Sequence, residues 1–94
     1  MKPWSVYVLE CQSGRLYTGV AVDPRKRLLA HASGKGARFT RADPPRRCLT
    51  VRQFPDQSSA LKEEHRIKQL SRTEKLDLIT QWQREGCHGF DLPT

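Results

Sequence analysis

Residues that can take part in acid–base or electrostatic chemistry stand at four places in the chain: Tyr7, Tyr17, Arg27 and the pair Glu63-Glu64. Taken one at a time, each has an ordinary explanation. A lone tyrosine is most often a core or half-buried residue, and adjacent glutamates usually form a solvated helix face. Arg27 is one of 17 lysines and arginines. A chemical role therefore depends on the elements that would bring these side chains together.

The glutamate pair lies in a segment that predicts a helix from Ser58 or Ser59 to about Leu70. At 100° per residue, Glu63 and Glu64 lie about 50° to either side of the centre of its apolar stripe, so at least one carboxylate points toward the sheet side. A carboxylate near a core needs a partner such as an arginine, a metal ion or ordered water. Periodicity leaves open which of the two glutamates this is.

The two tyrosines lie on two predicted strands, residues 4–11 and 16–22, which form a hairpin. The number of residues in its loop decides how the tyrosines are related. An even number puts Tyr7 and Tyr17 on opposite faces of the hairpin. An odd number, such as Gln12-Ser13-Gly14 with the glycine in the left-handed region, puts them on one face. The sequence permits both.

Turn and capping signals organise the middle of the chain. Asp23-Pro24 begins a helix that we expect to run to about Ala32. Residues 33–47 are rich in glycine, proline and basic side chains and predict a loop. Residues 48–54 then predict a third strand.

The last predicted helix begins at Ser71, whose spacing to Glu74 is that of a capping box, and runs to about Gln83. One face of this helix predicts core packing and consists of Leu76, Ile79 and Trp82. The order β-β-α-β-α-α predicts an α/β (α+β) fold in which about three helices flank a small three-stranded sheet. We expect residues 1–85 to form a single domain and residues 86–94 to be a flexible C-terminal tail.

The charge of the chain is basic and unevenly placed. The sequence has 17 Lys and Arg against 10 Asp and Glu, a net charge of +7, and residues 25–52 hold nine bases and one acid. Such a field favours a polyanion, nucleic acid first, while a plain solvated surface is the alternative. No apolar run approaches the ~18 residues of a membrane span, and no signal peptide is evident. Three widely spaced cysteines do not form a disulfide framework, so we expect a cytoplasmic protein with reduced thiols.

Together these features resemble the GIY-YIG nuclease family over roughly residues 4–80. That family opens with Gly-Ile-Tyr and Tyr-Ile-Gly on adjacent strands about ten residues apart. Here Val6-Tyr7-Val8 and Tyr17-Thr18-Gly19 stand in their places. The family's arginine follows the second tyrosine by about ten residues, at Arg27, and some members have a histidine one helical turn later, at His31.

The resemblance also distinguishes the two glutamates. The family's metal-binding glutamate follows an Ala-Leu start in the next helix, and Ile-Lys or Val-Lys comes soon after it. In residues 60–68, ALKEEHRIK, this pattern selects Glu64 over Glu63. The stretches HASGKGARFTR and RIKQLSRTEK are similar to the small, stand-alone bacterial branch of the family.

The resemblance implies a metal-dependent endonuclease that hydrolyses DNA phosphodiester bonds with one divalent cation, Mg²⁺ or alternatively Mn²⁺, held by Glu64. Arg27 would clamp the scissile phosphate, and Tyr7 would take the proton from the attacking water, with Tyr17 and His31 in supporting positions. Both tyrosines would then share one face, which requires the odd loop. A free phenol has a pKa of ~10, so Tyr7 would need a cationic neighbourhood.

We expect the nucleic acid to be held through its backbone, with little sequence readout and a preference for single strands or particular structures. The residues expected to bind it are Lys26, Lys35, Arg38, Phe39, Arg41, Arg46 and Arg47. DNA is the expected partner, and RNA is an alternative because phosphate contacts are alike. We expect a monomer or weak dimer that is targeted by substrate shape or by a protein partner.

One departure from the family keeps a second interpretation open. Family nucleases carry an asparagine about 12–15 residues after the glutamate, and this chain has no asparagine. Asp77 could take its place only if it lies on a suitable face. The alternative is a non-catalytic nucleic-acid-binding module that keeps the fold.

Overall fold

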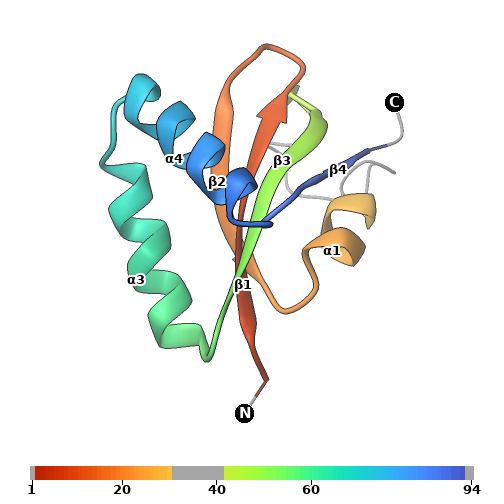
Figure 1. The fold of residues 1–94 in the computed structure, drawn as a ribbon. Helices are drawn as coiled ribbons and strands as arrows, with labels where there is room; N and C mark the ends of the chain where they lie inside the picture. Colours follow the sequence, from red (N-terminus) through yellow and green to blue (C-terminus); the bar gives the residue numbers. More distant parts are fainter. Residues whose placement is uncertain (1, 31–41, 93–94) are drawn as a thin grey trace.

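An antiparallel sheet in the order β2-β1-β3-β4 forms the centre of the computed structural model, which describes residues 2–30 and 42–92 (Figure 1). Its strands are β1 (Trp4–Cys11), β2 (Leu16–Ala21), β3 (Pro45–Phe54) and β4 (Phe90–Asp91). The helices are α1 (Pro24–Ala30), α3 (Gln57–Lys68) and α4 (Arg72–Arg84). The predicted α+β class is confirmed, and β4 is a strand that the sequence did not indicate.

The β1–β2 hairpin places both tyrosines on one face. Its register pairs Tyr7 with Gly19 and Leu9 with Tyr17. Directly opposite residues share a face, and so do residues two apart on one strand. Tyr7 and Tyr17 therefore lie diagonally across the same face of the sheet.

The loop of this hairpin has an odd number of residues. The Cys11 N–H donates to the Arg15 carbonyl at 2.9 Å, which leaves residues 12–14 as the loop. Gly14 has a φ of +90°, in the region where a glycine has no Cβ to clash. Of the two hairpins that the sequence permits, the chain adopts the one required by the GIY-YIG resemblance.

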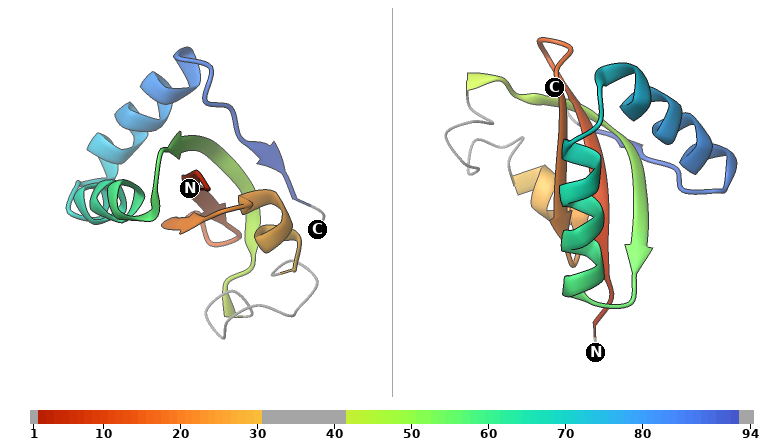
Figure 2. Two further views of the ribbon diagram at one scale, coloured as in Figure 1. Left: turned by 90° about the horizontal axis from the view of Figure 1, so that it is seen from below. Right: turned by 90° about the vertical axis from the view of Figure 1, so that its left-hand side faces the viewer.

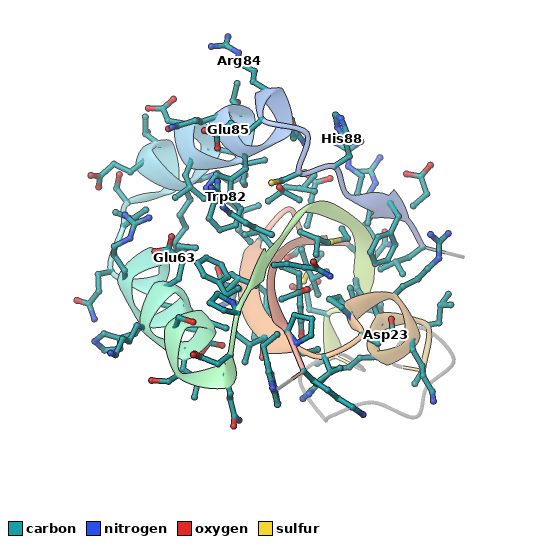
Figure 3. All side chains as sticks on the ribbon, turned by 60° about the horizontal axis from the view of Figure 1, so that its bottom comes forward. Asp23, Glu63, Trp82, Arg84, Glu85 and His88 are labelled. Carbon is teal, nitrogen blue, oxygen red and sulfur yellow. The ribbon has the colours of Figure 1, made fainter. Side chains whose placement is uncertain are left out.

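The central strand β1 is covered on both faces. On one face, beneath α1, a core cluster contains Tyr7, Leu9 and Leu28. On the other face, Val6 packs with residues of α3 and α4, namely Ala60, Ile67 and Trp82. Figure 2 shows the sheet between these two groups of helices, and Figure 3 shows Trp82 directed from α4 toward the sheet. The strand that carries Tyr7 is therefore held rigidly from both sides.

Side-chain caps fix where α3 and α4 begin. The Asp56 carboxylate accepts a hydrogen bond from the Ser59 N–H at 2.8 Å, so α3 starts slightly before the predicted serines. On α4 the predicted capping box is present, with Ser71 and Glu74 each accepting from the other's backbone N–H. None of the helices in the described ranges is long and apolar enough to cross a bilayer.

The buried face of α4 differs in one position from the prediction. Ile79 and Trp82 are buried as expected, but Leu76 is 42% exposed. Leu78 packs against the core cluster instead. The face of α4 that packs on the sheet therefore begins at Leu78 rather than at Leu76, where the periodicity placed its start.

Two predicted boundaries also differ from the structure. β3 begins at Pro45, so the end of the loop predicted over 33–47 belongs to a strand. After α4 the chain turns back and pairs Phe90 with Cys48, and the next buried residue, Leu92, joins the core cluster beneath α1. Residues 90–92 thus lie in the sheet and core rather than in the flexible tail expected over 86–94. A two-residue strand is too short to show a period in the sequence.

Candidate active site

The ring of Tyr7 crosses β2 at Gly19. A Cβ built on Gly19 would lie 2.5 Å from the Tyr7 hydroxyl oxygen and 2.6 Å from the ring carbon that bears it. Any larger residue would therefore collide with the ring. Because β2 is the edge strand of the sheet, the glycine lets the phenol lean over β2 and bring its hydroxyl toward that edge.

Tyr7 and Tyr17 share this face but differ in exposure. Tyr7 is 2% exposed, whereas Tyr17 is 37% exposed. Tyr7 is thus a core residue whose hydroxyl lies over Gly19 of β2. The second is accessible to a bound ligand.

The electrostatics of Tyr7 show which groups surround its hydroxyl. Burial raises its pKa to about 12; the Arg27 guanidinium acts against this, while Tyr17, Cys48 and Glu64 raise the pKa further. Such charge effects weaken with distance, so Arg27, Tyr17 and Glu64 all lie within electrostatic range of one phenol. The structure thus brings together four of the residues predicted to be catalytic.

Arg27 is presented by a short, well-capped helix. The Asp23 carboxylate accepts from the Lys26 N–H at 3.2 Å, and the Asp23 carbonyl accepts from the Arg27 N–H at 3.1 Å. The next residue, Leu28, is fully buried in the core, which fixes the orientation of α1. Arg27 itself is exposed, so its planar guanidinium is accessible to a phosphate.

The two glutamates of α3 have different surroundings. The Glu63 carboxylate accepts from the Arg66 Nε at 2.5 Å, and the Glu64 carboxylate pairs with the Lys68 Nζ at 3.3 Å. Of the two, only Glu64 affects the pKa of Tyr7. Glu64 is therefore the glutamate whose charge reaches Tyr7, a distinction that periodicity could not make.

A divalent cation fits the chemistry of this carboxylate. In the described parts of the chain no three His, Cys, Asp or Glu side chains gather around one point. Mg²⁺, however, usually keeps several waters and is held by one or two carboxylates together with substrate phosphates. The Glu64 side chain is 18% exposed, so its oxygens are reachable from solvent. The residues present therefore suit an ion shared between Glu64 and a bound phosphate.

The residues predicted to bind nucleic acid are only partly described. Lys26 on α1 and Arg46 on β3 are exposed, as a backbone contact requires. Arg47 is exposed too, and its Nε donates to the Glu10 carboxylate at 3.2 Å. The predicted site residues that lie outside the described ranges are His31, Lys35, Arg38, Phe39 and Arg41.

Asp77 does not lie on a face of α4 that would let it replace the missing asparagine. It is exposed on α4, and Ile79, two residues later, is buried. Residues two apart on a helix point about 200° apart, so Asp77 lies on the face opposite the core. The structure offers no support for Asp77 in place of the missing asparagine.

The raised pKa of Tyr7 predicts an alkaline weakness in the fold. Unfolding returns Tyr7 to its ordinary pKa of about 10, so the unfolded chain releases this proton before the folded chain does. The free energy of unfolding should therefore fall by about 2 kcal/mol as the pH rises from about 10 to about 12. Urea unfolding of wild type and Tyr7→Phe at several pH values measures this, since the phenylalanine variant should lack that part of the decline.

The matched control is Tyr17→Phe, which should keep most of the decline, because burial is the largest cause of the raised pKa of Tyr7 and Tyr17 adds a smaller part. Burial also raises the pKa of Cys48 to about 12, so both variants will show a remaining alkaline slope. Parallel curves for wild type and Tyr7→Phe would contradict a buried, protonated Tyr7.

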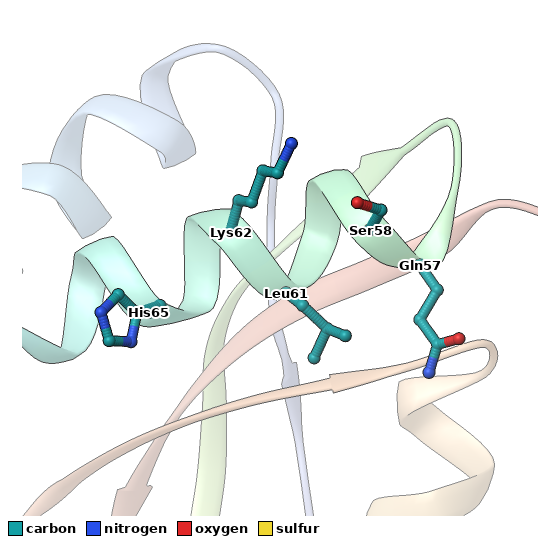
Figure 4. Close-up of a pocket in the computed structure, with 5 residues that line it drawn as sticks. All are labelled: Gln57, Ser58, Leu61, Lys62 and His65. Carbon is teal, nitrogen blue, oxygen red and sulfur yellow. The ribbon is translucent and has the colours of Figure 1, made fainter.

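A separate hollow of about 510 Å³ lies along the outer side of α3 (Figure 4). All of its lining comes from this one helix, and the residues are Gln57, Ser58, Leu61, Lys62 and His65. None of them is among the residues that surround the Tyr7 hydroxyl. This hollow therefore does not contribute to the candidate active site.

Comparison with known families agrees with this arrangement. A family model described as the GIY-YIG catalytic domain matches residues 3–77, which include both strands of the hairpin, α1 and α3. The chain belongs to the GIY-YIG family. The match extends over Tyr7, Tyr17, Arg27 and Glu64 and stops within α4.

Relatives of this GIY-YIG protein are bacterial proteins named UPF0213. It is 49% identical over 74 residues to one from Oceanobacillus iheyensis, covering 79% of this chain and 86% of the relative. It is 43% identical over 76 residues to one from Xanthomonas axonopodis pv. citri, covering 81% and 74%. A solution NMR structure of the UPF0213 protein BH0048 from Bacillus halodurans is similar, with a TM-score of 0.56, 40% identity and 84% of each chain covered.

Membership places the chain among nuclease domains in general, which act on nucleic acid. Motif spacing identified the residues around Tyr7, but it did not give Gly19 a physical role. The signal was available, because an odd loop between β1 and β2 puts Gly19 directly opposite Tyr7. The GIY-YIG pattern here thus includes a steric requirement as well as reactive groups.

Proposed function

We propose that this GIY-YIG domain is a metal-dependent endonuclease that hydrolyses phosphodiester bonds in DNA, with a preference for single strands or particular structures. The observation that carries the proposal is the buried Tyr7 ring crossing β2 at Gly19, on one face with Tyr17 and within electrostatic range of Arg27 and Glu64. It combines a phosphate-binding cation, phenols and a metal-binding carboxylate at an open sheet edge.

The side chains divide the work according to their chemistry. Arg27 would bind two oxygens of the scissile phosphate and hold it beside Tyr7. Tyr7 would accept the proton of the attacking water, and the exposed Tyr17 would help to position that water. A divalent ion held by Glu64 would neutralise charge on the phosphate and favour the ionised form of Tyr7.

The state of Tyr7 before substrate binds supports this division. Burial raises its pKa to about 12, so the free protein holds the phenol protonated at neutral pH. Once ionised, a phenol with so high a pKa is a strong base. Positive charge near its hydroxyl, beginning with Arg27, is therefore the condition for its use.

A second candidate is a nucleic-acid-binding module without catalysis. It is favoured by the lack of any asparagine in the chain and by the exposed position of Asp77 on α4. Under this alternative the basic surface would bind the phosphate backbone, and the residues around Tyr7 would be structural.

A cleavage assay separates the two. Labelled duplex, flap, branched and single-stranded DNA are incubated with the protein in Mg²⁺, Mn²⁺ or EDTA, and a parallel set uses RNA. Cleavage that requires the metal supports the endonuclease. Equal retardation of all substrates in gels, with no product in any metal, supports the binding module and contradicts the enzyme.

Arg27→Ala should lower the cleavage rate far more than the affinity. We expect kcat to fall roughly a hundredfold or more, because the charge that binds the scissile phosphate acts mainly in the transition state. The matched control is Arg84→Ala, which removes an exposed arginine of α4 that points away from the sheet (Figure 3). Single-turnover rates and filter-binding affinities check this, and a loss confined to affinity would make Arg27 an ordinary backbone contact.

A further inference from the structure

A pocket of about 590 Å³ lies on the same face of the sheet as Tyr7. Its floor is formed by Ser5 on β1 and by Val51 and Gln53 on β3. The register pairs Ser5 with Gln53 and Tyr7 with Val51, so the floor runs directly into the row that carries Tyr7. The pocket therefore lies on the row next to Tyr7 and toward β3, whereas the Tyr7 ring leans toward β2.

Two other segments form its walls. The turn before α1 and the first residues of α1 make one wall, which includes Val22 and Arg25. The segment that leads into β4 makes the other wall, with Phe90 contributing its ring. His88, labelled in Figure 3 on this segment, lines the same wall as Phe90. The same helix α1 thus lines the pocket and presents Arg27.

The floor has hydrogen-bonding groups that the protein does not use. Ser5 is 3% exposed, and no described residue forms a hydrogen bond with its hydroxyl. The Gln53 amide likewise has no partner in the described parts of the chain. Ser5 is buried, and a buried hydroxyl normally has a partner, while Gln53 is exposed and its amide offers both a donor and an acceptor. A ligand that supplies both kinds of hydrogen-bonding group therefore fits here.

The walls favour a flat, uncharged ring. The Arg25 guanidinium lies 5.1 Å from the centroid of the Phe90 ring, which forms a stacking surface of a cation and an aromatic. Val22, although apolar, is 44% exposed at the rim. The Asp23 carboxylate also lines the pocket, and its charge offsets that of Arg25 and disfavours a phosphate.

We propose that this pocket holds one unpaired nucleobase of the strand that is bound at Tyr7 and Arg27. The base would stack on the Arg25–Phe90 pair, where the two walls meet, and hydrogen-bond to Ser5 and Gln53. This inference rests on the proposed function, since it takes a nucleic acid as the ligand. It goes beyond the family pattern, because the Phe90 wall lies outside the matched residues 3–77.

The test compares two strands of equal charge. A labelled oligothymidylate of about ten nucleotides and a strand of the same length without any bases are titrated against the protein in EDTA, with fluorescence anisotropy as readout. Phosphate contacts are the same in both, so the ratio of the two dissociation constants reports base contacts alone. We expect wild type to prefer the base-bearing strand by roughly tenfold.

The double variant Ser5→Ala/Gln53→Ala should lower that preference roughly three- to tenfold and leave affinity for the baseless strand unchanged. Gln53→Ala alone, at an exposed position, serves if the double variant does not fold. Gln81→Ala, at an exposed glutamine of α4, is the matched control and should change neither constant. In NMR spectra the Gln53 side-chain amide should shift with the base-bearing strand, and the Gln81 amide should not.

Other outcomes overturn the proposal in distinguishable ways. If both strands bind equally well, or the double variant weakens both alike, the pocket does not hold a base, and the proposed nuclease is unaffected. The Gln53 amide signal can also be titrated with thymidine monophosphate. If the resulting dissociation constant equals that of the base-bearing strand, the pocket binds single nucleotides and does not form part of the binding site for a longer strand. If neither strand binds, nucleic acid is not the ligand, and the proposed function fails as well.

Discussion

Glu64→Ala should abolish metal-dependent cleavage, with a loss in rate of roughly a thousandfold or more. The variant removes the carboxylate that would hold the divalent ion, and such an ion contributes several kcal/mol to phosphoryl chemistry, where each 1.36 kcal/mol is about tenfold. Its partner Lys68 is exposed and pairs with the half-buried Glu64 at 3.3 Å, and such i,i+4 pairs on a helix add about 0.3–0.5 kcal/mol. Folding should therefore be almost unchanged, and product release from labelled DNA measures the effect.

The neighbouring glutamate provides a close control for this experiment. Glu63→Ala removes an equally half-buried carboxylate from the same helix turn, along with its pair to Arg66. Because Glu63 does not act on the Tyr7 hydroxyl, we expect its loss to leave the cleavage rate within about twofold. If the two variants lose activity alike, Glu64 has no special role at the metal. If Glu63→Ala is the inactive one, the assignment of the two glutamates is reversed.

Gly19→Ala should damage the fold and the site together. The added methyl would lie 2.5 Å from the Tyr7 hydroxyl oxygen, so the ring must move away from β2. Such overpacking destabilises proteins by about 1–3 kcal/mol. Because the hydroxyl of the proposed base would be displaced from its position over β2, we also expect cleavage to fall roughly a hundredfold. Urea unfolding and the cleavage assay measure the two effects.

A double variant shows whether the ring is the cause. In a Tyr7→Leu background the ring is absent, and alanine is intrinsically better than glycine inside a strand by about 0.5–1 kcal/mol. Gly19→Ala should therefore change sign and become neutral or slightly stabilising. Equal destabilisation by Gly19→Ala in both backgrounds would mean that contacts other than the Tyr7 ring exclude a side chain at this position.

Features set by local sequence could be predicted, and they cover most of the fold. The Ser71–Glu74 capping box and the two hairpin strands are local signals, and the structure has them. Local rules left open whether the hairpin loop has an even or an odd number of residues, because loop length depends on which backbone groups pair across the strands. The family resemblance implied that Tyr7 and Tyr17 share one face, which requires an odd loop, and the structure has that loop.

Features that depend on distant parts of the chain could not be predicted. Periodicity placed Glu63 and Glu64 symmetrically about the apolar stripe, and the position of Tyr7 is what distinguishes them. The strand β4 was missed because two residues carry no period, and its pairing partner Cys48 lies far earlier in the sequence. The pocket beside Tyr7 is built from three separate segments, so no single stretch of sequence indicates it. The raised pKa of Tyr7 is likewise a consequence of burial in the assembled core.

The packing of Leu92 beside Tyr7 has a consequence for the order of events during synthesis. Leu92 belongs to the same core cluster as Tyr7, Leu9 and Leu28, although it follows them by more than sixty positions. On a ribosome, the hairpin and α1 emerge long before this residue does. Until it arrives, the core beneath the Tyr7 ring lacks one of its walls. A nascent chain would therefore not hold this phenol in its final environment until residue 92 has left the exit tunnel.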